Sequence, residues 1–375
     1  MNILVLGWRD PKHPLAGGAE QVMHEHMRGW LQGGYNKVTL FSSGVKGLPE
    51  KETLDGVEII RRGDQYFGVK VAAFFYYLKN RKRIDFVVDQ FHGIPFFTPL
   101  YVKRPKLAVL QEVAGRVWFL NELPFPLNYL VGLFGYLIEP IILLFYKQVP
   151  FMVGSNSAKD DLIKMGISDK KITIVPHGVI VYRPAPFPNK EKVKTITFLG
   201  ALAKDKGIEG AIKAFSILAK KGDFRFWVIG RGSPDYKDFL TSTCEELGIV
   251  KKVRFWGYVS QTKKFELLAR SYILINPSVR EGWGLVNIEA NSVATPVVAY
   301  ASQGLIDSVN DGQSGIICKQ NRPDSMAEEV LSLLANKQKY EKLQKSALLW
   351  SKGFIWSKSR EISLGLIEKI KMRSF

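Results

Sequence analysis

The sequence predicts an α/β protein made of two doubly wound domains. The chain opens with a strand at residues 3–7, a loop with Gly17 and Gly18, and a helix at 19–32, which is how a doubly wound domain begins. Its 375 residues exceed what one ordinary core supports. A stretch at 181–194 contains three prolines and several charges without periodicity, as a linker does. We therefore expect one domain on each side of this stretch.

Strands and helices alternate in both halves. In the first half, further strands are predicted at 38–42, 57–61, 86–89, 106–111 and 151–154. In the second half, we predict strands at 196–200, 224–230, 253–258, 272–276 and 296–300, with helices at 208–220, 235–247, 265–270 and 286–293. Parallel strands need helical crossovers, so each half forms its own parallel sheet. The predicted domains are 1–180 and 190–350, with helices from about 325 and a last helix at about 355–375 that packs back on the first domain.

The net charge of +18 and the pI near 9.6 indicate an anionic partner without naming it. Nucleic acid, anionic lipid and a phosphorylated substrate are all anions that a protein with this positive charge would attract. Basic clusters stand close to aromatic residues at 74–77, which suits an anionic membrane surface, although a solvated basic face beside core aromatics explains the same pattern. These clusters are Lys79, Arg81, Lys82 and Arg83, and Lys103, Arg104 and Lys106.

Two sequence features bear on location. Cys244 and Cys318 stand far apart and form neither a disulfide framework nor a metal-ligand spacing, which suits a reducing compartment. The segment 127–153 is rich in apolar residues, but Glu139, Pro140 and Lys147 interrupt it, so no transmembrane helix is predicted. We expect a cytoplasmic protein, with the inner face of the membrane as the surface that it would contact.

The most specific motif runs from Glu281 to Glu289. Glu281 lies in a predicted loop and Glu289 on the following helix, just over two helical turns later. Gly282 and Gly284 stand where this helix begins, and uncovered backbone amides at a helix start bind phosphate. Carboxylates accept hydrogen bonds from sugar hydroxyls. The motif therefore predicts a phosphorylated sugar ligand, against the alternative that both glutamates are solvated helix charges.

With this motif the chain resembles the retaining glycosyltransferases of the GT-B fold, and within them glycosyltransferase family 4, whose signature is two glutamates separated by seven residues. Other motifs of the family follow in order along nearly the whole chain. They are Gly17-Gly18-Ala19-Glu20, Ser155-Asn156-Ser157, Val175-Pro176-His177-Gly178, Lys206-Gly207, Gly257-Tyr258-Val259-Ser260 and Thr295-Pro296-Val297-Val298. The resemblance implies two Rossmann-like domains that face each other across a cleft, with the acceptor on the first and the nucleotide sugar on the second.

The resemblance also assigns roles to residues. It implies that Glu289 binds the ribose of the donor, Glu281 binds the transferred sugar, and Lys206 neutralises the diphosphate as the glycosidic bond breaks. For Lys206, a solvated surface charge is the alternative. The remaining donor contacts fall to backbone amides, to the first-domain glycines and to residues near the nucleobase, which are Gly282, Trp283, Gly284, Leu285, Gly17, Gly18, Gly230, Arg231 and Tyr258.

Two positions depart from the family pattern. The family usually has an arginine directly after the strand glycine that Gly200 matches, and here this residue is Ala201. Where related sequences place a histidine against the transferred sugar, this chain has Gln111, which can hydrogen-bond a hydroxyl but cannot become cationic. Arg116 or Arg231 could supply the lost charge from another direction. We count Gln111 with Glu281 and Lys206 as the candidate catalytic residues.

The implied reaction moves a sugar, as a hexosyl group, from a UDP- or GDP-linked donor to a glycan or lipid-linked acceptor. It needs no cofactor and no metal, and His24 and His26 point to different faces of a helix and make a poor metal pair. No nucleic-acid partner is expected. The alternative from another class is a weak or inactive protein that binds a nucleotide sugar or scaffolds a partner enzyme. A nicotinamide-dependent oxidoreductase is disfavoured because neither opening strand is followed by G-x-G-x-x-G.

Overall fold

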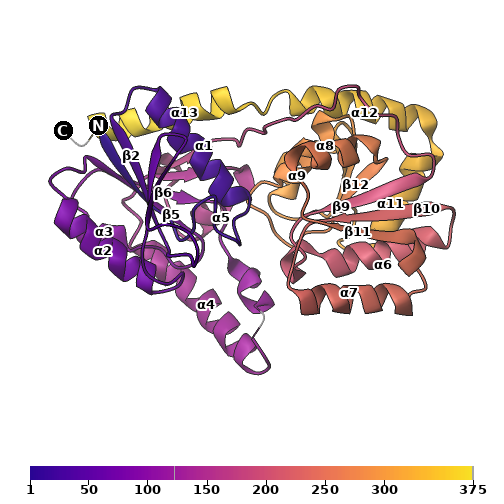
Figure 1. Cartoon of the computed structure of the whole chain (residues 1–375), viewed down its shortest axis with the longest axis horizontal. Helices are drawn as coiled ribbons and strands as arrows, with labels where there is room; N and C mark the ends of the chain where they lie inside the picture. The colour runs from indigo at the N-terminus through magenta and orange to yellow at the C-terminus, as the bar shows by residue number, and fades with distance from the viewer. Residues whose placement is uncertain (122, 374–375) are drawn as a thin grey trace. The chain divides into compact units, whose positions relative to one another are not determined.

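A computed structural model describes residues 1–121 and 123–373 (Figure 1). The chain forms two compact units. The first comprises Met1–Gly178 and the C-terminal segment that begins at Ile355, and the second comprises Val179–Phe354. At the boundary of the second unit, the Val179 amide donates to the Phe354 carbonyl at 3.1 Å, so the entering and leaving segments pair with each other.

The first unit is built on one eight-stranded sheet in the order β3-β4-β2-β1-β5-β6-β7-β8. All neighbouring strands are parallel except β3 and β4. The strands are β1 (Asn2–Leu6), β2 (Lys37–Ser42), β3 (Lys51–Leu54), β4 (Val57–Arg61), β5 (Phe86–Phe91), β6 (Lys106–Leu110), β7 (Phe151–Val153) and β8 (Ile172–Ile174). The central strands are buried on both faces, which is why they read as continuous apolar runs.

Helices flank this sheet. They are α1 (Gly18–Gln32), α2 (Gly68–Asn80), α3 (Thr98–Tyr101), α4 (Leu127–Leu144), α5 (Asn156–Lys164) and α13 (Trp356–Met372), with short 3₁₀ turns η1 (Gly115–Leu120) and η2 (Asp169–Lys171). The last helix, α13, packs against α1 (Figure 1). Ser363 accepts from the Trp30 indole at 3.1 Å and pairs with His26 at 3.0 Å. A Cβ on Gly29 would lie 2.6 Å from Arg360, so the glycine permits this close approach.

The second unit has a six-stranded parallel sheet in the order β11-β10-β9-β12-β13-β14. Its strands are β9 (Lys194–Leu199), β10 (Phe224–Ile229), β11 (Val253–Gly257), β12 (Ile273–Asn276), β13 (Val297–Ala299) and β14 (Gly315–Ile317). Its helices are α6 (Ile208–Ala219), α7 (Pro234–Glu246), α8 (Gln261–Arg270), α9 (Leu285–Ser292), α10 (Leu305–Ser308), α11 (Pro323–Ala335) and α12 (Lys337–Ser351), with 3₁₀ turns η3 (Lys204–Lys206) and η4 (Val250–Lys252). The predicted fold class, two Rossmann-like α/β domains with parallel sheets, is confirmed.

Every strand and helix that the sequence predicted is present. Most ends differ by no more than two residues, whereas α8 begins four residues before its predicted start at 265. Three short strands were missed, namely β3, β8 and β14. Strand β3 has the sequence Lys-Glu-Thr-Leu and alternates between exposed and half-buried positions at the sheet edge, so it carries little hydrophobic signal. Strands β8 and β14 have three residues each, which is too short for periodicity to identify them.

Helix α4 departs from expectation. Glu139 and Pro140 were predicted to interrupt the apolar segment, but the helix continues through both of them. By length and composition alone it is long and apolar enough to cross a membrane, with a mean hydropathy of 1.7 over 18 residues. Only 28% of those residues are buried. The helix therefore exposes much more apolar surface than a core helix of a soluble domain.

The predicted linker contains neither helix nor strand between 179 and 193, all of which the structure describes. It is nevertheless fastened to the second unit. The Lys190 ammonium donates to the Ser271 carbonyl at 2.5 Å and to the Thr295 hydroxyl at 2.8 Å. Burial lowers the pKa of Lys190 to about 7. This ordered segment is therefore held by contacts with the turn between α8 and β12 and with the turn before β13.

Candidate functional site

The second unit has a topological switch point between β9 and β12. From β9 the chain moves to β10 on one side, and β12 later returns to the other side. In open α/β sheets the crevice outside the carboxyl ends of two such strands binds ligands. The loop after β9 carries Lys206, and the loop after β12 carries Glu281. The fold thus brings two predicted catalytic residues to the place where a ligand is expected.

Lys206 and Glu281 form an ion pair there. The Lys206 Nζ lies 3.0 Å from Glu281 Oε1 and 3.4 Å from Asp205 Oδ2. Glu281 also accepts from the Ser278 hydroxyl at 2.9 Å. About a quarter of the Lys206 side chain and a fifth of that of Glu281 remain exposed, at 25% and 19%. A partly exposed ammonium and carboxylate can each exchange their present partner for an incoming ligand.

Two glycines hold the loops at this distance. Gly207 has a φ of 70°, and a Cβ there would lie 2.1 Å from the Pro277 carbonyl oxygen. Gly304 has a φ of 78°, and its Cβ would lie 2.1 Å from the Glu281 carbonyl oxygen. Both positions combine a left-handed backbone with contact against another main chain, which only glycine tolerates. The Lys206-Gly207 motif therefore has a structural reason in addition to its charge.

Helix α9 begins at the predicted phosphate-binding turn. Gly284 caps the helix with a φ of 78°. Buried amides fix the helix to the sheet, since Asn276 Nδ2 donates to Asn287 Oδ1 and Asn287 Nδ2 donates to Ser308 Oγ, both at 2.9 Å. Trp283 is buried, and its ring packs on Phe354 with centroids 5.3 Å apart. In this turn, Trp283 offers only its backbone to a ligand, as do its neighbours Gly282, Gly284 and Leu285.

Glu289 has a partner that the sequence did not reveal. Its Oε1 accepts from the Lys264 Nζ of α8 at 2.5 Å, and 16% of the Glu289 side chain and 13% of that of Lys264 are exposed. Glu289 lies five residues after Gly284, which is more than one turn along the helix. No motif marked Lys264, because the two residues lie on different helices and meet only when α8 packs against α9.

The predicted nucleobase residues surround the carboxyl ends of β9, β10 and β11. Gly230 has a φ of 144°, and a Cβ there would lie 1.7 Å from the Gly200 carbonyl oxygen. The Gly230 amide donates to the Gly257 carbonyl at 2.9 Å. Arg231 is exposed, and its guanidinium lies 5.1 Å from the centre of the Tyr258 ring, which is 72% exposed. An exposed aromatic face next to a cation can stack against a flat ligand.

In the first unit, the glycine loop lies at the matching switch point, between β1 and β5. Gly17 and Gly18 are exposed at the start of α1. The Gly17 amide donates to the buried Glu20 carboxylate at 2.7 Å. A ligand anion at this helix start would therefore have to displace Glu20. The Gly17-Gly18-Ala19-Glu20 motif thus forms a self-capped turn in this structure.

Gln111 follows β6 and meets His177. The His177 Nε2 lies 2.8 Å from Gln111 Oε1, and because an amide oxygen only accepts, the histidine donates from this nitrogen. Burial lowers the pKa of His177 to about 4, so the ring is neutral at pH 7. A Cβ on Gly154 would lie 2.4 Å from the ring, so this glycine leaves room for it. The sequence marked both residues but did not predict that they pair.

The other residues that the sequence singled out are Ala201, Arg116 and the two histidines of α1. Ala201 and Arg116 are both exposed, Ala201 two residues after β9 and Arg116 on η1. His24 lies 2.9 Å from Asp55, whereas His26 pairs with Ser363 of α13, so the two rings make their contacts on different sides of α1. Among residues 1–121 and 123–373, no group of three or more metal-ligating side chains comes close enough to hold an ion.

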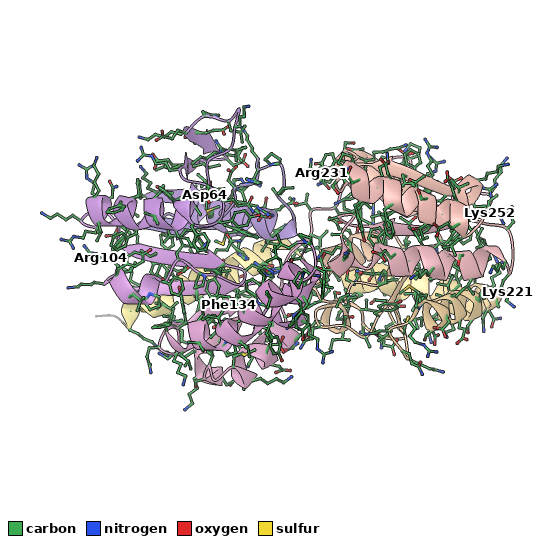
Figure 2. All side chains as sticks on the ribbon, turned by 90° about the horizontal axis from the view of Figure 1, so that it is seen from below. Asp64, Arg104, Phe134, Lys221, Arg231 and Lys252 are labelled. Atoms are coloured by element: carbon green, nitrogen blue, oxygen red, sulfur yellow. The ribbon has the colours of Figure 1, made fainter. Side chains whose placement is uncertain are left out.

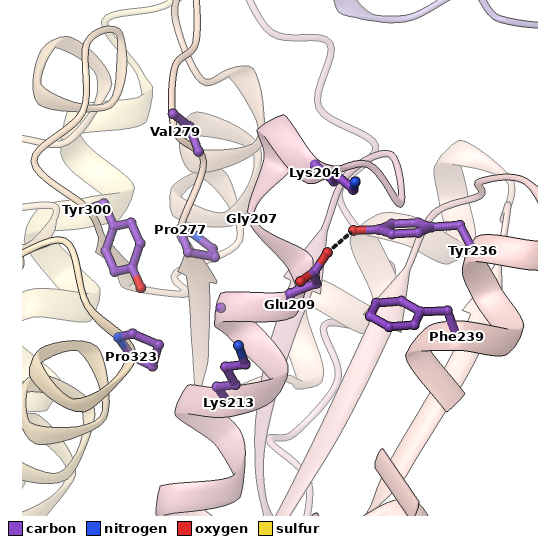
Figure 3. Close-up of a pocket in the computed structure, with 11 residues that line it drawn as sticks. Lys204, Gly207, Glu209, Lys213, Tyr236, Phe239, Pro277, Val279, Tyr300 and Pro323 are labelled. Atoms are coloured by element: carbon purple, nitrogen blue, oxygen red, sulfur yellow. Dashed lines mark hydrogen bonds between the residues drawn. The ribbon is translucent and has the colours of Figure 1, made fainter. Parts of the chain in front are cut away.

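A hollow of about 720 Å³ lies on the second unit beside the same loops (Figure 3). Tyr236 donates to Glu209 at 2.8 Å on one wall, and the Tyr236 ring stacks on Phe239. None of the predicted site residues, all of which the structure describes, lines this hollow. Its wall includes Gly207 and Pro277, whose backbone contact positions Lys206.

A family model and several curated relatives match part of this chain. Residues 183–350 match the family model of glycosyl transferases group 1. An uncharacterized glycosyltransferase of Methanocaldococcus jannaschii is 33% identical over 143 residues, which is 38% of this chain and 36% of that protein. The first curated relatives match this chain over 36% to 44% of their own length.

Solved structures match over the whole chain. Sucrose-phosphate synthase of Thermosynechococcus elongatus superposes with a TM-score of 0.80 at 16% identity, covering 99% of this chain and 98% of that one. HepE of Anabaena in complex with UDP-glucose gives a TM-score of 0.73 at 16% identity, covering 98% and 100%. At this identity the likeness shows the fold alone, which is GT-B.

Proposed function

We propose that this chain is a retaining glycosyltransferase, because residues 183–350 match the family model of glycosyl transferases group 1 and the fold is GT-B. Its donor is a UDP- or GDP-linked hexose, and its acceptor is a hydroxyl of a glycan or lipid-linked molecule. The observation that carries the proposal is the Lys206–Glu281 pair, 3.0 Å apart, at the switch point of the second unit.

The pair separates when the donor binds. A diphosphate offers Lys206 a stronger counter-charge than one carboxylate, and the α9 amides from Gly282 to Leu285 bind the phosphate oxygens. Glu281, released from Lys206, accepts hydrogen bonds from the sugar hydroxyls. Glu289 does the same for the ribose, with Lys264 orienting its carboxylate. Tyr258 and Arg231 provide the surface for the base, next to Gly230.

In the transfer step, the bond between the anomeric carbon and the phosphate oxygen breaks, and a bond from that carbon to the acceptor oxygen forms. The acceptor proton passes to the departing phosphate oxygen. Lys206 stabilises the charge that develops on this oxygen, which is where electrostatic catalysis has most effect. Gln111, Gly17 and Gly18 are the first-unit residues assigned to this reaction, with Gln111 hydrogen-bonding a sugar hydroxyl. No cofactor or metal takes part in the proposed step.

The direct test is calorimetric titration with UDP, GDP and their common sugar conjugates. HepE, a structural neighbour, was solved with UDP-glucose, which makes this donor the first to try. We expect one base to bind and Glu289→Ala to lose that binding. Glu246→Ala is the matched control, because Glu246 is an exposed glutamate of α7 in the same unit. Retention is checked by the anomeric NMR signal of the product.

A catalytically weak or inactive protein is the second candidate, and Ala201 and Gln111 favour it because a phosphate cation and a sugar-facing histidine of the family pattern are both replaced. Such a protein binds the nucleotide sugar or scaffolds a partner enzyme. It would bind the donor with the same Glu289 dependence but give neither transfer nor hydrolysis. Folded protein that binds no nucleotide at all would contradict the donor site itself.

A further inference from the structure

Helix α4 exposes a continuous apolar stripe. Its side chains recur every three or four residues on one face of the helix and are each between 50% and 66% exposed. The stripe consists of Leu127, Leu130, Phe134, Leu137, Ile141 and Leu144. Glu139 is the one charged residue in the sequence of this helix. Exposed apolar surface of this extent marks an interaction site.

The opposite face of α4 is occupied by protein. Buried Glu139 accepts from the Ala114 and Gly115 amides at 2.7 and 2.8 Å and from the Trp118 indole at 3.2 Å. A Cβ on Gly135 would lie 2.3 Å from Trp118, so η1 packs directly on the helix backbone. A membrane-spanning helix needs apolar surface all round, whereas here the polar side faces the protein. The helix can therefore enter only one leaflet, lying along the surface.

A basic hollow of about 610 Å³ adjoins the end of this stripe. Phe145, which directly follows α4 and is 48% exposed, lines it. Seven cationic side chains surround it, and none of its described lining residues is acidic. The cations are Lys103, Arg104, Lys106, Lys170, Lys171, Lys369 and Arg373. They come from the start of β6 and the loop before it, from η2 and from the end of α13, so the fold gathers charges far apart in the sequence.

We propose that the α4 stripe and the basic hollow together bind the surface of an anionic lipid bilayer, with α4 lying in the headgroup region and the hollow on lipid phosphates. Apolar side chains beside a cluster of cations match the two layers of such a surface. A second copy of this chain is a poorer occupant, because a two-fold contact would bring two basic hollows together. This surface contains none of the donor residues, so the inference stands apart from the proposed reaction.

Flotation of the full chain with vesicles tests it. Vesicles of phosphatidylcholine with about a third phosphatidylglycerol should carry the protein at low salt, pure phosphatidylcholine should carry much less, and high salt should release it. The stripe variant Leu130→Gln, Phe134→Gln, Leu137→Gln and the hollow variant Arg104→Glu, Lys170→Glu should each lower the partition coefficient at least about tenfold.

Matched controls lie on the second unit. Lys221→Glu with Lys345→Glu changes the net charge equally at exposed positions, and Leu349→Gln removes an apolar side chain that is 65% exposed. Phe134 and Arg104 on the first unit and Lys221 on the second are marked in Figure 2. The controls should float like the parent protein. Circular dichroism and nucleotide titration check that every variant is folded, which separates this test from that of the proposed function.

Three results would overturn the inference. One is equal flotation of the parent, stripe and hollow variants. Another is resistance of vesicle-bound protein to both high salt and alkaline carbonate, which would mean a spanning helix. The third is a concentration-dependent dimer in light scattering that the stripe variant abolishes, without vesicle binding by the parent; the stripe would then bind a second copy.

Discussion

Lys206 and Glu281 lie 75 positions apart in the chain, yet their side chains form an ion pair at 3.0 Å. The pair closes the gap between two loops, one after β9 and one after β12, and Gly207 fixes it by its contact with Pro277. The two charges neutralise each other. A bound diphosphate would form an ion pair with the Lys206 ammonium, and a sugar hydroxyl would donate a hydrogen bond to the Glu281 carboxylate.

Glu281→Gln should lower the transfer rate by about 10²–10³-fold, the range found when one stabilising polar contact is removed from a transition state. The affinity for the free nucleoside diphosphate should stay equal or rise, because Lys206 loses its competing partner. Initial rates with the donor that the titration identifies, together with calorimetry, measure both effects. A rate loss explained entirely by weaker diphosphate binding would contradict the assigned role.

Ala201→Arg should tighten binding of the nucleoside diphosphate. Ala201 is exposed two residues after β9, so a longer side chain has room, and a second cation would join Lys206. A charge-assisted contact supports a gain of about tenfold in affinity. Ala201→Gln is the control of similar reach without charge, and the nucleoside alone should bind unchanged. If Ala201→Arg leaves diphosphate affinity unaltered, the phosphates lie elsewhere.

Gly230→Ala should destabilise the second unit by at least about 2 kcal/mol, because the new Cβ meets main chain at a strained φ. The Cβ would lie 1.7 Å from the Gly200 carbonyl oxygen at a φ of 144°. Gly248→Ala is the matched control, since its φ is 69° but no atom lies within 4 Å of the added Cβ. Urea unfolding midpoints compare them, and an equal shift for both variants would show that the backbone contact has no effect.

Acidification should destabilise the first unit through His177. Its pKa falls from 6.5 to about 4 on folding, so between these values the unfolded chain binds more protons than the folded chain. This contribution is fully present above pH 6.5 and is lost as the pH falls toward 4. From pH 7 to pH 5 it amounts to about 2 kcal/mol.

The measurement for this prediction is urea unfolding at several pH values for the parent protein and for His177→Gln. The variant removes the titrating ring, so its free energy of unfolding should fall less steeply with acid. His26, whose pKa burial lowers to about 3, supplies a similar slope that remains in both proteins. Identical slopes for the parent and the variant would show that His177 does not titrate as inferred.

The sequence alone determined the alternation of elements and most of the residues at issue. Alternating apolar runs and amphipathic segments are local patterns, so β1, α1 and β9 could be read directly. The spacing from Glu281 to Glu289 is also local, because a loop followed by a helix start is encoded within nine residues. Strand β3 was not predicted from the sequence, because an exposed edge strand has few apolar residues to mark it.

Only the tertiary structure decided which distant side chains meet. The pairs Lys264–Glu289 and Gln111–His177 form between elements that pack together, and no short-range pattern encodes them. The same holds for α4, whose sequence is apolar apart from a few polar residues such as Asn128 and Glu139. Packing of η1 buried the side with Glu139 and left the other side exposed. Which face of such a helix is covered depends on its neighbours, and this is decided by the fold of the whole unit.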